Sequence, residues 1–114
     1  MPILKITTDL QAGQIPNDFL AKTSALIAKL TGKPESYVQV IVSCNNLLSF
    51  GGKVGSSAFV ELSSVGGFGG KTNDIAEKLT GILSSELKIA ENRFYINFKD
   101  VEANELSFNG RTFG

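Results

Sequence analysis

The stretch FLAKTSALIAKLTGKPESYVQVIVS, residues 19–43, holds a helical pattern followed directly by a strand pattern. The side chains at helix-face spacing are Phe19, Leu20, Thr23, Ile27 and Leu30. Asn17 or Asp18 can cap the start of this helix, and Gly32, just before Lys33 and Pro34, ends it. The β-branched and aromatic residues from Tyr37 to Ser43 then predict a strand.

A second helical pattern follows later in the chain, at Ile75, Leu79, Ile82, Leu83 and Leu87. Thr72 or Asn73 can cap its start, and Lys88 lies near its C-terminal dipole. Strand composition recurs in four segments, Ile3 to Thr8, Tyr37 to Ser43, Ser57 to Leu62 and Phe94 to Phe98. The predicted order is strand, helix, strand, and then the same three elements again.

The two halves repeat a pattern at an expected offset of 57 residues. This offset pairs Ile3 with Val60, Leu30 with Leu87 and Tyr37 with Phe94. Two βαβ units of this kind predict an α/β (α+β) fold of two layers, in which a four-stranded mixed sheet carries both helices on one face. With 114 residues, we expect a single domain spanning residues 1–114.

The other face of such a sheet has no helix to cover it. Because the strand from Tyr37 to Ser43 is apolar on both sides, a monomer would expose an association surface, so we expect an oligomer. The C-terminal tail carries Phe108 and Phe113 beyond the last predicted strand. These rings could pack on a neighbouring chain or fold back on their own.

Composition excludes several partners. The chain has 11 Lys and Arg residues against 11 Asp and Glu residues, which argues against nucleic acid as a partner. Its apolar runs are far shorter than the roughly 20 residues needed to span a membrane. The start, MPILKITTDL, lacks the pattern of a secretory signal. We therefore expect a cytoplasmic protein, any export of which avoids the usual secretory route.

The residue counts also exclude several catalytic centres. With no histidine and only Cys44, the chain cannot form a Ser-His-Asp triad, a Cys-His dyad, a Cys/His zinc site or an internal disulfide. A base can instead come from Pro2, because removal of Met1 would leave a secondary amine at the N-terminus. Apolar burial and a nearby cation would lower the pKa of that amine enough to keep it neutral.

The glycine-rich stretch from Gly66 to Thr72 lies between a predicted strand and a predicted helix, where a phosphate-binding loop would belong. The first glycine of that motif would have to fall at Val65, so the register fails by one residue. A flexible turn is the preferred interpretation, and the same holds for Ser49 to Gly52.

Six ordered blocks of sequence resemble one family. They are MPILKITT at the start, residues 31–38 (TGKPESYV), 48–52 (LSFGG), 64–67 (SVGG), 93–98 (RFYINF) and 108–114 (FNGRTFG). Together they are similar to the tautomerase family of macrophage migration inhibitory factor and D-dopachrome tautomerase, and the resemblance covers essentially the whole chain.

This resemblance implies a homotrimer with three active sites at subunit boundaries. Pro2 would be the catalytic base, and Lys33 would bind an anionic substrate and help keep Pro2 neutral. Ser64 and Val65 would form part of the pocket wall, while Tyr95 and Asn97 would enter from the adjacent subunit. The apolar mouth of the pocket would be lined by Tyr37, Leu106, Phe108 and Phe113. The implied activity is keto–enol tautomerisation of phenylpyruvate-type or dopachrome-type substrates, with no metal or organic cofactor.

The chain also departs from the family pattern. Ser57 and Val60 stand where cytokine members carry a Cys-x-x-Cys pair, and Ala12 and Asn45 stand where they carry an Arg and an Asp. Phe108 replaces a tryptophan that many members have. Two functions therefore stay open: an enzyme of small aromatic keto acids, or a cytokine-like or host-modulating protein whose pocket serves mainly for binding, with a cell-surface receptor as partner.

Overall fold

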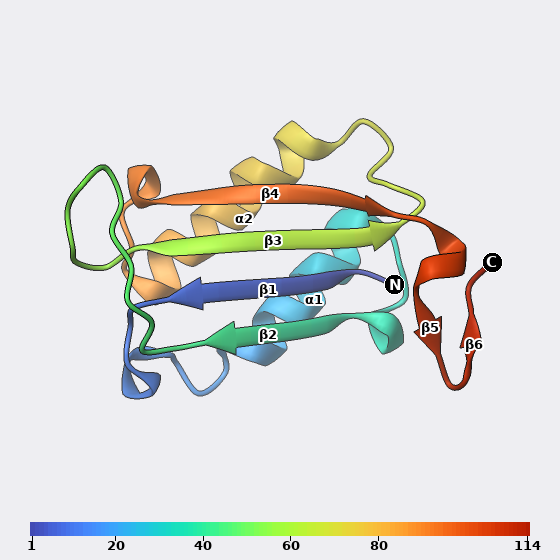
Figure 1. Cartoon of the computed structure of the whole chain (residues 1–114), viewed down its shortest axis with the longest axis horizontal. Helices are drawn as coiled ribbons and strands as arrows, with labels where there is room; N and C mark the ends of the chain where they lie inside the picture. The colour runs from blue at the N-terminus through green and yellow to red at the C-terminus, as the bar shows by residue number, and fades with distance from the viewer.

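The computed structural model describes residues 1–114 as two layers, a four-stranded sheet and two helices that lie across one of its faces (Figure 1). The main elements are β1 (Ile3–Thr8), α1 (Phe19–Thr31), β2 (Gln39–Ser43), β3 (Ala58–Val65), α2 (Thr72–Leu87) and β4 (Phe94–Val101). Short 3₁₀ turns are η1 (Ala12–Gln14), η2 (Glu35–Tyr37), η3 (Glu91–Arg93) and η4 (Ala103–Glu105). A small hairpin of β5 (Ser107–Phe108) and β6 (Arg111–Thr112) ends the chain. The fold class expected from the sequence is confirmed.

The sheet is mixed, with the strand order β2-β1-β3-β4. Strands β1 and β2 are parallel, as are β3 and β4, because a helix returns the chain across the sheet in each half. The two halves join through the antiparallel pair β1 and β3, in which Ile3 is opposite Ser63. The strand over Gln39–Ser43 begins later than predicted, because Glu35–Tyr37 form a 3₁₀ turn, while β3 and β4 extend beyond Leu62 and Phe98.

The core lies between the sheet and the helices. It is built mainly from Leu4, Ile6, Val60 and Leu62 on the sheet and from Phe19, Ile27, Ile75, Leu79 and Leu83 on the helices, all at most 1% exposed. Burying one such side chain contributes about 1.5–3 kcal/mol relative to its exposed state. The assignment of Leu20 to the buried stripe is wrong, since its side chain is 50% exposed, and Ile82 is only partly buried.

The predicted offset between the halves is wrong by one residue. Side chains on the helix-facing side match at an offset of 56, which pairs Leu4 with Val60, Thr23 with Leu79 and Val40 with Ile96. The predicted pairing of Ile3 with Val60 joins opposite sides of the sheet, because side chains alternate along a strand and a slip of one residue reverses every face.

The helix ends follow glycine and backbone geometry more than side-chain caps. Gly32 ends α1 in the left-handed conformation at φ 70°, and its N–H donates to the carbonyl of Ala28. Lys88 plays the same part for α2 at φ 59°. At the start of α2 the predicted caps are wrong, because Lys71 occupies the N-cap position. Asp18 is the N-cap residue of α1 but makes no side-chain capping bond.

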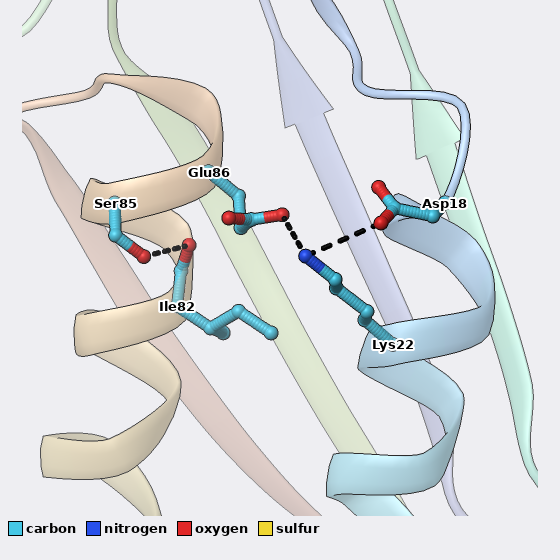
Figure 2. Close-up of polar contacts among 5 residues, drawn as sticks. All are labelled: Asp18, Lys22, Ile82, Ser85 and Glu86. Carbon is cyan, nitrogen blue, oxygen red and sulfur yellow. Dashed lines mark hydrogen bonds and ion pairs between the residues drawn. The ribbon is translucent and has the colours of Figure 1, made fainter.

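Lys22 joins the two helices on their outer surface. Its Nζ atom lies 3.2 Å from a carboxylate oxygen of Glu86 on α2 and 3.2 Å from one of Asp18, as Figure 2 shows.

Neither helix has the length and apolar character that a membrane crossing requires.

The sheet face opposite the helices is open in the single chain (Figure 1). Ile41, Phe59 and Tyr95 are exposed on it by 37%, 38% and 66%. Lys5 and Glu61 are opposite each other on the same face. The open face therefore mixes charged and apolar side chains, whereas the sequence predicted an apolar surface. The C-terminal tail folds back on its own chain: the ring centroid of Phe113 lies 5.9 Å from that of Tyr37.

Candidate active site

The N-terminus lies at the end of the molecule that carries the β5–β6 hairpin (Figure 1). Pro2 precedes β1 and is buried. Its carbonyl accepts a hydrogen bond from the backbone N–H of Gln39 at 3.0 Å. This bond extends the β1–β2 pairing by one step and fixes the start of the chain against the sheet, so Pro2 has a defined position.

A cavity of about 270 Å³ opens beside the N-terminus. It is lined by Met1, Ile3, Ser36, Tyr37, Val38, Gln39, Leu106, Ser107, Phe108 and Phe113. Its aromatic side chains form one cluster, in which the Tyr37 ring is edge-on to Phe108 at 5.2 Å and to Phe113 at 5.9 Å. The structure therefore brings together all four predicted mouth residues, and a flat apolar ligand suits this wall.

Lys33 reaches the same end of the sheet because the left-handed Gly32 reverses the chain after α1. Its Nζ atom donates to the carbonyl of Val65 at 3.5 Å, at the C-terminal end of β3. The side chain is partly exposed, and it affects the charge of the N-terminal amine.

The pKa of the Met1 amino group is lowered from its usual value of 8.0, first by burial and then by the positive charge of Lys33. Both effects disfavour the protonated amine, so a larger fraction of it is neutral near pH 7. More of the Met1 amine is therefore free to accept a proton at neutral pH than of the same amine in water.

Ser64 and Val65 lie next to this corner but do not line the cavity. Both are buried, Ser64 completely, and its Oγ atom has no hydrogen-bond partner. Ser64 follows the core residues Val60 and Leu62 at a spacing of two residues, so it is on the same side of β3 as they are, the side that faces the helices. Within one chain the hydroxyl is part of the core.

Tyr95 lies toward the opposite end of the sheet. Asn97 lies nearer the middle, opposite Glu61 of β3. Tyr95 is opposite Phe59 on β3, and Phe59 is opposite Thr7, near the C-terminal end of β1. Pro2 lies at the other end of β1, just before its first residue. The side chains of Tyr95 and Asn97 are exposed, and the Tyr95 ring packs on Phe50 at 5.1 Å. A single chain does not bring them to Pro2, so a site that uses all of these residues needs a second copy.

Several cavity residues were not predicted from the sequence: Ile3, Ser36, Val38, Gln39 and Ser107. The alternation along β1 was the available signal for Ile3, which occupies its open face. Ser36 and Ser107 had none, because their positions depend on the η2 turn and on the return of the C-terminal hairpin. No three His, Cys, Asp or Glu side chains gather closely enough to hold a metal ion.

Comparison with known proteins relates the whole chain to one family. The sequence model of the family described as "Macrophage migration inhibitory factor (MIF)" matches residues 1–114. The macrophage migration inhibitory factor homolog of Brugia malayi is 45% identical over 115 residues, covering 100% of both chains.

Two solved structures agree as well. That of macrophage migration inhibitory factor from Trichinella spiralis has a TM-score of 0.93 at 38% identity, covering 97% of this chain and 99% of the other. The homologue from Prochlorococcus marinus has a TM-score of 0.90 at 33% identity, covering 98% and 99%. The chain belongs to the macrophage migration inhibitory factor family.

Proposed function

We propose that the protein is a cofactor-independent keto–enol tautomerase of small aromatic keto acids, with the amine of Pro2 as its catalytic base. One observation carries this proposal: the amine of Met1, its pKa lowered by burial and by Lys33, lies beside an aromatic-walled cavity. Met1 and Ile3 both line that cavity, and removal of Met1 would leave the nitrogen of Pro2, which lies between them in the chain, as the terminal amine.

The chemistry needs only two proton transfers, one from carbon and one to oxygen. The neutral nitrogen of Pro2 takes a proton from the carbon next to the substrate carbonyl, and the electron pair of the broken C–H bond forms the C=C bond of an enolate. The enolate oxygen then receives a proton to give the enol, and the reverse direction begins at the enol hydroxyl. The Lys33 ammonium holds the carboxylate of the substrate, while Tyr95 or Asn97 steadies the oxygen that gains charge.

The assembly we propose is a homotrimer. The open sheet face, with Phe59 and Tyr95 exposed on it, supports association. The distance between Pro2 and Tyr95 within one chain supports a pocket completed by a neighbouring copy. We further propose that the protein acts in the cytoplasm and that any release from the cell does not use a signal peptide.

A second candidate is a cytokine-like role in which the pocket mainly binds a ligand or a receptor. The names of the relatives, which refer to inhibition of macrophage migration, favour it. The two roles separate in a cell-response assay, because a catalytically inactive protein keeps a signalling activity that depends only on its surface.

The decisive experiment blocks the base without changing the fold. An alanine inserted ahead of Pro2 turns the proline nitrogen into an amide, which cannot accept the proton. We expect loss of phenylpyruvate tautomerisation with unchanged circular dichroism and mass of the assembly, and mass spectrometry of the unmodified protein should show Met1 absent. Pro2→Gly is the matched control, since its primary amine should keep part of the activity. Full activity in the blocked protein would show that Pro2 is not the base.

A further inference from the structure

The loop between β2 and β3 carries a tight hairpin at its centre. Phe50 and Lys53 exchange both backbone hydrogen bonds, at 2.9 and 3.1 Å, around Gly51 and Gly52. Both glycines have positive φ, 60° and 79°, as the two central residues of a type I′ turn require. This glycine pair forms the turn expected from the sequence, and a side chain from outside the loop holds the turn in place.

That anchor is the side chain of Arg93, at the end of η3. Its NH1 nitrogen donates to the carbonyl of Phe50 at 3.0 Å, and its NH2 nitrogen donates to those of Lys53 and Gly55 at 3.1 and 3.0 Å. Its Nε atom donates to the carbonyl of Ser56 at 3.3 Å. These are the only hydrogen bonds between residues 47–56, called here the 47–56 loop, and the rest of the chain.

The same guanidinium also lies over the Phe50 ring, 6.0 Å from its centroid. Phe50 also packs against Tyr95, with the ring centroids 5.1 Å apart and the planes tilted by 48°. Tyr95 projects from the edge strand β4 and is 66% exposed. Phe50 is therefore the aromatic neighbour that restricts the rotamers of an otherwise free ring.

We propose that Arg93 is a positioning residue for the active site: it holds the 47–56 loop, the loop keeps Phe50 against Tyr95, and Tyr95 thereby presents a fixed ring to the substrate. The part that concerns substrate rests on the proposed function. Arginine suits the task because its planar fork reaches several carbonyls at once, whereas a lysine ammonium at the same place would reach fewer of them.

Two measurements test the anchor without any substrate. The chain has no tryptophan and two tyrosines, so in a Tyr37→Phe background the near-ultraviolet circular dichroism of tyrosine reports on Tyr95 alone. Arg93→Met should reduce that signal strongly. Trypsin cleavage after Lys53, inside the loop, should become about 10-fold faster or more, since proteolysis follows the population of the open loop.

Kinetics then connect the anchor to the site. Arg93→Met should lower kcat/KM for a phenylpyruvate-type substrate by about 10-fold or more, since small misplacements of a positioning group have effects of this size. The pH midpoint should not move, because Arg93 is proposed to act on the position of the Tyr95 ring and not on the charge of the Pro2 nitrogen. Phe50→Leu should produce the same loss, and the double variant should lose little more than either single variant.

Matched variants keep the test decisive. Lys53→Met removes one positive charge from the same loop and leaves the carbonyls free to bind Arg93, so Tyr95 and the kinetics should be unchanged. If Arg93→Met does not fold, the same measurements are made on Arg93→Lys and Phe50→Leu. Arg93→Lys is expected to show intermediate effects. An unchanged Tyr95 signal in an opened loop, or additive losses in the double variant, would overturn the proposal. If the unmodified protein does not turn over the substrate but the loop and the Tyr95 signal respond as expected, the proposed function is contradicted and the positioning by Arg93 is not.

Discussion

The Nζ atom of Lys33 and the carbonyl oxygen of Val65 lie 3.5 Å apart, which joins the end of α1 to the end of β3 beside the N-terminus. A long contact to one neutral acceptor leaves the ammonium with donors to spare for a substrate. The same charge acts on the N-terminal amine and lowers its pKa. The proposed function therefore assigns two separable effects to Lys33, one on the base and one on the substrate.

Replacing Lys33 by methionine should move the pH–rate profile to higher pH. Lys33 lowers the pKa of the Met1 amine, and its charge would act in the same direction on the Pro2 nitrogen one residue further along. Removal of the charge should therefore raise the pKa of the base, so that the neutral base appears only at higher pH. Part of the lowering should remain, because burial is its larger cause. Measurement of kcat/KM against pH checks this, with the exposed Lys29→Met on α1 as a control that should not shift the midpoint. An unmoved midpoint would mean that the base is not coupled to Lys33.

The same variant should discriminate between substrates. A charge-assisted contact is worth about 1.5–3 kcal/mol, so turnover of a keto acid should fall by roughly 10-fold or more beyond any loss seen with its ester. Steady-state kinetics at a pH where both proteins have a neutral base isolate this effect. Equal losses for acid and ester would show that Lys33 does not hold the carboxylate.

A pocket shared between copies should allow complementation. Protein blocked by an alanine ahead of Pro2 lacks the base, and Tyr95→Ala lacks the aromatic ring from the adjacent copy. If the two are denatured and refolded together, mixed assemblies contain some pockets with neither defect, so activity should exceed that of either variant refolded alone. Light scattering should show a trimer in each case. A monomer with full activity would contradict the shared pocket.

Ser64 provides a test of its place in the core. Its Oγ atom is fully buried without a hydrogen-bond partner, a state that costs about 1–3 kcal/mol for a hydroxyl. Ser64→Ala should therefore leave the free energy of unfolding unchanged or raise it by about 1 kcal/mol, with kcat/KM unaffected. Denaturant unfolding and kinetics on the same variant check both parts. A large loss of activity in a protein of normal stability would place the hydroxyl in contact with substrate.

Gly32 connects helix termination to the site. It has φ +70° and no heavy atom within 4 Å of the position a Cβ would take, so Gly32→Ala meets backbone strain without a clash. We expect a loss of about 1–2 kcal/mol of stability, the usual cost of a left-handed alanine. Gly13→Ala, also free of neighbours and without a positive φ, should be close to neutral in the same urea titration.

The order of the elements and the helix stripes could be read from the sequence, because local periodicity records which side of an element is buried. Phe19, Ile27, Leu79 and Leu83 occupy the core as their spacing predicts. The aromatic mouth at Tyr37, Phe108 and Phe113 was anticipated through the family resemblance, and the structure places these rings together.

Relationships between elements were decided only by the tertiary structure. The offset of 56 residues between the halves follows from which side chains face the core in the folded chain, and a slip of one residue changes little in the local pattern while reversing every face. The burial of Ser64 in the core and the hydrogen bonds from Arg93 to the 47–56 loop were also decided by the tertiary structure. Both depend on contacts between residues far apart in the chain. The identity of one residue does not predict which distant group it will contact.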